Sequence, residues 1–138
     1  MEAIEYLEQV RRIDAQMRII QAQVNNIVEL SGLNYDKIPA QTIGGSKTER
    51  LAMYRIELLN EYEDKRNELT SARLEVVSTI LELKGRYKVE VMYKRYIELK
   101  RWRKIARELH LSESMVFKVH SAAIEDVNRM LKDYSKLQ

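Results

Sequence analysis

The segment YKRYIELKRWRKIARELHLSESMVFKVHSAAIEDV, residues 93–127, decides the fold of the C-terminal third of the chain. Within it, residues 102–109 have the composition of a short helix. Ile105, Ala106 and Leu109 lie at positions i, i+1 and i+4, which gives that helix one apolar stripe. Because Ala106 is small, a second helix can approach closely there. Trp102 is expected to fill the space between the helices.

A turn and a second helix follow directly. His110 and Leu111 form the turn, and Leu111 closes the gap between the two helices. Ser112 is suited to cap the next helix, because its hydroxyl can accept a hydrogen bond from an amide that the helix leaves unpaired. The apolar residues that then recur at helical spacing predict the buried face: Val116, Val119, Ala123 and Val127. A short helix, a tight turn and a capped second helix predict a helix-turn-helix.

The opposite face of the second helix is the one that a helix-turn-helix presents to DNA. Side chains there enter the major groove, where lysine suits guanine acceptors, phenylalanine a thymine methyl group and glutamate the amino group of cytosine. We therefore predict a recognition helix over residues 113–125. Its predicted base-reading residues are Glu113, Ser114, Phe117, Lys118 and Ser121.

Cations surround the preceding helix. Contacts to phosphate hold a protein on duplex DNA without reading its sequence. The predicted phosphate-binding residues are Lys100, Arg101, Arg103, Lys104, Arg107, Ser112 and His120. The pattern leaves two alternatives open: the run from Lys100 to Lys104 could be an ordinary solvated face, and His120 could be a partly buried polar side chain.

The charge of the chain is unevenly distributed along it. Residues 1–45 hold four basic and six acidic residues, and residues 46–85 hold seven and eight. Residues 86–138 hold thirteen basic and seven acidic residues. A positive end on a mildly acidic chain is typical of a protein that meets a polyanion at that end.

The first part of the chain predicts two long helices. Residues 2–30 repeat apolar side chains three and four positions apart, as in a coiled-coil seam: Ala3, Tyr6, Val10, Ile13, Met17, Ile20, Val24 and Ile27. Ser31 and Gly32 predict its end, residues 33–46 with Pro39 predict a loop, and Ser46 with Glu49 has the form of a capping box. The second predicted helix runs from there to about residue 84. Its apolar residues share one face that Lys65 interrupts: Leu51, Tyr54, Leu58, Tyr62, Leu69, Ala72, Val76, Ile80 and Leu83.

These elements predict an all-α fold, with a long, coiled-coil-like N-terminal helical hairpin followed by a small helix-turn-helix domain. One proline and four glycines leave room for such long helices. We place the hairpin at residues 1–85 and the DNA-binding domain at residues 86–138, where we expect helices over 87–96, 102–109 and 113 to about 134. The hairpin can close within one chain or between two chains, and the spacing does not distinguish these arrangements.

The C-terminal segment resembles phage and prophage transcriptional regulators of the ArpU/RinA kind, whose C-terminal part is similar to the fourth region of bacterial sigma factors. The residues that carry the resemblance are Arg95-Tyr96-Ile97, Trp102, Ile105-Ala106, Leu109, Ser112, Val116, His120 and Ala123. It covers about forty residues strongly and the N-terminal hairpin more weakly. Ile124 stands where a leucine is usual, and Glu113, Ser114 and Phe117 make a less basic reading edge.

The resemblance implies a sequence-specific, double-stranded DNA-binding transcription regulator of phage or prophage late genes. The alternative is a phage assembly or interaction protein, such as a small terminase subunit or an adaptor of host RNA polymerase. Expected partners are double-stranded DNA, a second copy of the chain held through the N-terminal helices, and host RNA polymerase. No run of about 18 apolar residues predicts a membrane span, so we expect the protein in the cytoplasm of a bacterial host.

Catalysis and cofactors find little support in the sequence. The chain has no cysteine, and its two histidines, His110 and His120, are not spaced as zinc ligands. The segment from Gly44 to Lys47 lacks the first glycine of a phosphate-binding loop. Glu61, Glu63 and Asp64 form the kind of charge cluster that any long solvated helix carries. We expect neither an enzyme nor a cofactor.

Overall fold

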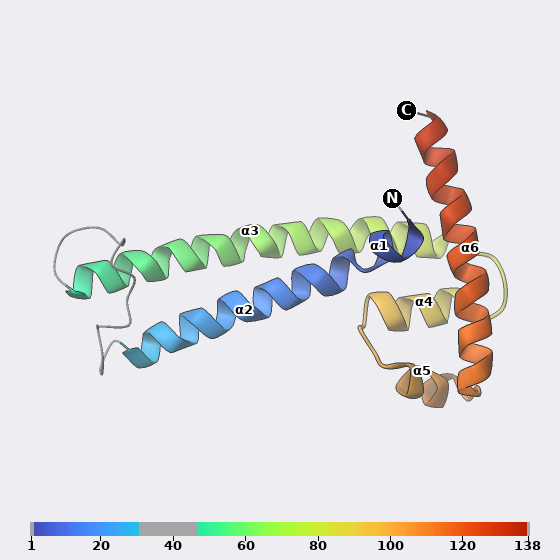
Figure 1. Ribbon diagram of the computed structural model, residues 1–138, viewed down its shortest axis with the longest axis horizontal. Coiled ribbons are helices and arrows are strands. Elements are labelled where there is room, and N and C mark those ends of the chain that lie inside the picture. The colour runs from blue at the N-terminus through green and yellow to red at the C-terminus, as the bar shows by residue number, and fades with distance from the viewer. Residues whose placement is uncertain (1, 31–46, 138) are drawn as a thin grey trace. The chain divides into compact units, whose positions relative to one another are not determined.

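The computed structural model describes residues 2–30 and 47–137, and every regular element in this part of the chain is a helix (Figure 1). The helices are α1 (Ala3–Leu7), α2 (Gln9–Leu30), α3 (Lys47–Leu81), α4 (Lys88–Tyr96), α5 (Trp102–Leu109) and α6 (Glu113–Leu137). A long α2·α3 hairpin and smaller C-terminal helices that pack together confirm the predicted fold class. None of the described helices has the length and apolar character needed to cross a membrane. Three predictions lie outside the described residues: the helix end at Ser31-Gly32, the loop over 33–46 and the Ser46 cap.

The predicted N-terminal helix is divided at Glu8. Its ψ of −3° departs from the helical value, so α1 and α2 are separate elements. Hydrogen bonding nevertheless continues across the break, because the Glu8 amide donates to the Ile4 carbonyl at 2.9 Å and the Arg12 amide donates to the Glu8 carbonyl at 3.0 Å. Leu7, which lies outside the predicted seam, is fully buried beside Tyr6.

Packing divides the chain into two compact units. One unit holds residues 1–12 and 70–138, and the other holds residues 13–69. Residues 2–12 therefore belong to the same unit as α4, α5 and α6. The domain boundary predicted after Gly85 follows function rather than packing, and it stays a prediction.

The unit of residues 13–69 is built on the α2·α3 pair. Val24 and Ile27 of α2 form an apolar cluster with Leu51 and Leu58 of α3, and Tyr54 packs against it. These residues belong to the two predicted apolar faces, so the seam of α2 is used within the chain. Of the two arrangements that the sequence left open, the structure adopts the intramolecular hairpin.

One apolar cluster of the other unit is formed by α4, α5 and α6. The cluster joins Val91 of α4, Ile105 and Ala106 of α5, and Val116 of α6. Half-buried side chains surround it: Tyr87, Trp102, Leu109, Leu111 and Val119. The contact between the two predicted helix-turn-helix faces is thereby confirmed, and Trp102 fills the predicted space at their side. Val91 was not predicted, because apolar residues lie on more than one face of the short helix α4, at Val89, Val91 and Met92.

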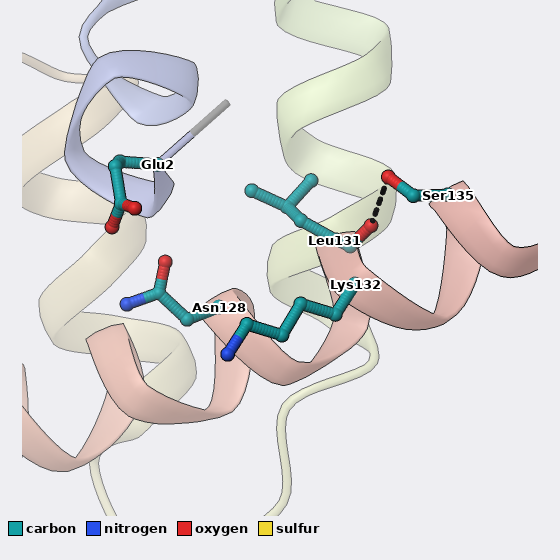
Figure 2. A pocket seen from close by; sticks show the side chains of 5 residues that line it. All are labelled: Glu2, Asn128, Leu131, Lys132 and Ser135. Carbon is teal, nitrogen blue, oxygen red and sulfur yellow. Dashed lines mark hydrogen bonds between the residues drawn. The ribbon is translucent and has the colours of Figure 1, made fainter.

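Helix α1 packs against α6 in this unit. The Ala3 amide donates to Oδ1 of Asn128 at 2.9 Å, and the Tyr6 hydroxyl lies 2.8 Å from Oγ1 of Thr79. Burial raises the pKa of Tyr6 above its usual value. Figure 2 shows Glu2, next to α1, and Asn128 of α6 on opposite sides of a small hollow.

Candidate nucleic-acid interface

The turn between α5 and α6 is set by a left-handed residue. His110 has φ 57° and ψ 41°, a conformation that side chains other than glycine rarely adopt. Its amide donates to the Arg107 carbonyl at 3.3 Å, and the Leu111 amide donates to the Ala106 carbonyl at 2.9 Å. This pair of bonds is the Schellman motif, which ends α5 and turns the chain sharply. His110 is therefore a turn residue, as predicted.

Ser112 begins α6 in the predicted way. Its hydroxyl oxygen accepts a hydrogen bond from the Met115 amide at 3.1 Å, and its carbonyl accepts one from the Val116 amide at 3.0 Å. One amide that the first turn would leave unpaired is thus satisfied. The cap fixes where α6 starts and hence which of its residues face outward.

The exposed face at the start of α6 forms a shallow, open hollow, which we call the reading hollow. It is lined by the five residues predicted to read bases: Glu113, Ser114, Phe117, Lys118 and Ser121. All five are exposed, and Phe117 keeps 45% of its surface accessible. The structure thus brings the whole predicted base-reading set together. Whether they contact DNA stays a prediction.

The Phe117 ring is supported from one side by Trp102. The two ring centroids are 5.2 Å apart and the planes are inclined at 59°, a favourable aromatic geometry. The Arg95 guanidinium carbon lies 4.3 Å from the centroid of the indole ring, and Nη1 of Arg95 donates to the Lys100 carbonyl at 3.1 Å. Burial lowers the pKa of Arg95. Helices α4 and α5 therefore hold the Trp102 ring that supports Phe117.

His120 makes contacts within the unit that fit the second of the two roles left open for it. Its Nε2 lies 2.6 Å from the hydroxyl of the buried Tyr96, and its ring is stacked on Tyr96 and edge-on to Trp102. Burial, followed by the nearby Arg95, lowers the pKa of His120 to about 4, while burial raises the pKa of Tyr96 to about 12. A histidine that is neutral at pH 7 attracts phosphate poorly. These contacts favour the alternative role of His120, a partly buried polar side chain, and its phosphate contact stays a prediction.

Lys100 is paired with acidic side chains of the chain itself. Its Nζ donates to both oxygens of Glu108, at 2.6 and 3.0 Å, and lies 3.2 Å from Glu98. Lys94 reaches the same Glu108 carboxylate at 2.9 Å. The hydrogen bonds from Lys100 and Lys94 lower the pKa of Glu108 to about 2, and Glu108 raises that of Lys100. Neighbouring segments thus supply the acids that residues 100–104 lack. Lys100 joins Glu98, which follows α4, to Glu108 of α5.

The other α5 cations stay exposed. Arg103, Lys104 and Arg107 follow each other at helical spacing opposite the buried Ile105, and we call them the cationic face. Arg101, just before α5, is exposed too. Within the described ranges, Lys104, Arg107 and Arg101 form no ion pair. Nε of Arg103 lies 3.5 Å from Glu113, which joins the cationic face to the reading hollow.

The hollow of Figure 2 is lined by Glu2, Asn128, Leu131, Lys132 and Ser135, and its drawn hydrogen bond joins Oγ of Ser135 to the Leu131 carbonyl within α6. Among the residues that the structure describes, no three His, Asp or Glu side chains are grouped as a metal site.

Comparisons with protein-family models, with curated proteins and with solved structures found no match for this chain. The resemblance to phage regulators therefore rests on the residues quoted above, and it stays a prediction.

Proposed function

We propose that the chain binds double-stranded DNA through α5 and α6 and regulates phage or prophage genes. One observation carries the proposal: five residues chosen from sequence as base-reading line a single exposed hollow, and the Arg103–Glu113 ion pair joins that hollow to a face of exposed cations. An apolar ring, a lysine and two hydroxyls beside a cationic face are suited to base edges flanked by phosphates.

In this proposal the recognition helix, residues 113–125, enters the major groove. Lys118 bonds guanine acceptors, and Phe117, supported by Trp102, contacts a thymine methyl group. The cationic face and Arg101 neutralise phosphates, and Ser112 adds a contact at the start of α6. The protein acts without a cofactor in a bacterial cell, as two copies on adjacent half-sites, because one helix-turn-helix makes few contacts. Host RNA polymerase is the further partner that the resemblance suggests.

The proposal is tested by selecting duplexes from a random-sequence library and measuring their affinity against a scrambled duplex at several salt concentrations. We expect the selected duplex to bind more tightly. Lys118→Ala and Phe117→Ala should reduce that preference, by about 1–3 kcal/mol per lost base contact. Lys104→Ala should instead weaken all duplexes alike and reduce the slope of log affinity against log salt by about 1.

Lys100→Ala is the matched control. Its ammonium group is held by Glu98 and Glu108, so we expect a nearly unchanged salt slope, although it lies four residues from Lys104 in the same basic run. Equal affinity for selected and scrambled duplexes would contradict sequence-specific regulation. Absence of binding to any duplex at low salt would contradict DNA binding as a whole.

A further inference from the structure

Phe117 is the one apolar side chain among the five residues that line the reading hollow, and it rests on Trp102. The two ring centroids are 5.2 Å apart, and the other four lining residues are polar. Phe117 keeps 45% of its surface exposed, so the protein covers only part of its ring. A side chain that is ordered before binding loses less entropy when it binds. The position of the indole therefore affects how well Phe117 is prepared to contact a base.

The indole of Trp102 is held in turn by Arg95, near the end of α4. The guanidinium carbon lies 4.3 Å from the centroid of the indole ring, and Nη1 of the same group donates to the Lys100 carbonyl at 3.1 Å. A planar guanidinium both stacks on an aromatic ring and is attracted by it, whereas an ammonium group acts only as a point charge. The Arg95 side chain thus joins α4 to the segment before α5 and covers part of the Trp102 ring.

The hydrogen bonds of Arg95 do not by themselves explain its orientation. Its Nε atom is buried and has no hydrogen-bond partner in the part of the chain that the structure describes. A buried donor without a partner is unfavourable, so another contact must compensate for it. The contact between the guanidinium and the Trp102 ring does so.

The backbone at Arg95 is anchored from the start of α2. Nη2 of Arg11 donates to the Arg95 carbonyl at 3.2 Å, and Nε of Arg11 donates to the Glu8 carboxylate at 3.1 Å. The last carbonyls of a helix have no partner within the helix, so Arg11 satisfies one of those of α4. Residues 2–12 belong to the same packing unit as α4 and α5. Arg95 is therefore held at both its backbone and its side chain.

We propose that Arg95 is a positioning residue for the recognition of a thymine methyl group: it fixes Trp102, and Trp102 holds Phe117 against the methyl group in the major groove. Thymine presents this methyl group on its major-groove edge, where an apolar side chain can contact it. Arg95 itself contacts neither base nor phosphate. The inference rests on the proposed function, and it adds the residue outside the reading hollow on which the preference for one methyl group depends.

Replacing thymine by deoxyuridine in the duplex selected from the random-sequence library tests the methyl contact. Deoxyuridine pairs with adenine as thymine does and lacks only the methyl group. We expect a thymine position at which the replacement weakens binding about fourfold, the effect of one buried methyl group. Arg95→Gln removes the guanidinium and should bring this thymine-to-uracil ratio close to one, as Phe117→Ala should. Arg95→Lys keeps the charge but not the stacking plane, so its ratio should be intermediate.

Arg101→Gln is the matched control, because it removes a nearby arginine that is exposed. We expect it to reduce the slope of log affinity against log salt by about 1 and to leave the thymine-to-uracil ratio unchanged. The two Arg95 variants should show the reverse, a changed ratio with an unchanged slope. A reduced slope with an unchanged ratio in Arg95→Gln would indicate that Arg95 contacts phosphate, and it would overturn the inference.

Fluorescence of Trp102, the only tryptophan, tests the positioning step without DNA. We expect acrylamide to quench Trp102 more strongly in Arg95→Gln than in the wild-type protein, because the guanidinium no longer covers the ring. Arg101→Gln should leave the quenching unchanged. Circular dichroism checks that the helices persist, and Arg95→Lys carries the comparison if Arg95→Gln unfolds. Equal quenching in the wild-type protein and both Arg95 variants would overturn the inference.

The two kinds of failure are distinguishable. If no duplex binds at low salt, the proposed function fails and the inference fails with it. If the selected duplex binds but tolerates uracil at every thymine position, only the inference fails.

Discussion

The hairpin of residues 13–69 and the unit that holds α4, α5 and α6 are stabilised in different ways. In the hairpin, the ion pairs Asp14–Arg18 and Lys65–Glu68 each join residues three or four positions apart on one helix. In the other unit, ion pairs and hydrogen bonds also join different segments of the chain: Lys88–Asp126, Lys94–Glu108, Lys100–Glu108 and Tyr96–His120.

This difference shows what each region requires of its sequence. A hairpin needs only two matching apolar faces, so its helices tolerate exposed residues such as Ile19 and Ile56. A small helix-turn-helix has a limited core and needs polar contacts at fixed places to orient its outward side chains. We therefore expect mutations in the second region to be more damaging and more sensitive to pH.

The largest effect is expected from truncation in the two apolar cores. Ile105→Ala removes a fully buried side chain between three helices and should destabilise its unit by about 2–5 kcal/mol. Leu58→Ala, in the two-helix seam, should reduce the free energy of unfolding by an amount near the lower end of that range, because the neighbouring helix can relax into the space. Trp102 is the only tryptophan, so its fluorescence during urea unfolding follows the Ile105 unit, while circular dichroism follows all helices. An equal shift of the Trp102 midpoint by both variants would contradict the distinction.

The next largest effect is expected from lowering the pH, which should destabilise the unit that holds His120. His120 has a pKa of about 4 in the folded chain against a usual 6.5, so the unfolded chain takes up a proton first as the pH falls. Stability is therefore full above about pH 6.5 and declines toward pH 4, by about 1 kcal/mol for a half-buried ring. Thermal unfolding followed by Trp102 fluorescence should show this decline, and His120→Gln should abolish it. A second decline, from protonation of Glu108, should lie between its usual 4.5 and about 2. A His120→Gln variant with an unchanged slope above pH 4.5 would refute the assignment.

The helix cap should have a smaller effect. Ser112→Ala removes the acceptor of the Met115 amide and should cost about 1 kcal/mol in urea unfolding monitored through Trp102. Ser112→Asp is the control, since it supplies an equivalent acceptor and should retain most of the stability. If both variants lose the same amount, the hydroxyl contributes through something other than capping.

The smallest expected effect is an increase in stability. His110 is in the left-handed region, with φ 57°, so His110→Gly removes local strain and should stabilise the unit by about 0.5–1 kcal/mol, less the greater freedom of glycine in the unfolded chain. His110→Val is the opposite control and should destabilise, because a β-branched side chain fits that conformation poorly. Thermal unfolding measures both. A destabilised His110→Gly variant would show that the imidazole makes a contact that outweighs the strain.

Much of this molecule could be predicted from local patterns. The apolar faces of α2 and α3, the extent of α5, the turn at His110 and the cap at Ser112 each depend on residues within a few positions of one another. The grouping of the reading hollow has the same origin, since one helix carries all five of its residues. Such features follow from helix periodicity and capping chemistry, which a sequence expresses directly.

Contacts between distant residues were decided only by the tertiary structure. In the sequence, Lys100 and Lys104 belong to the same basic run, but in the structure Glu98 and Glu108 pair with Lys100. The His120 side chain likewise has an internal partner, since its Nε2 lies 2.6 Å from the Tyr96 hydroxyl. The closure of the α2 seam within one chain belongs to the same group. The sequence alone determined which residues share a helix face, because helical spacing is local. Only the tertiary structure decided which charges are neutralised and which faces are occupied, because those partners come from other helices.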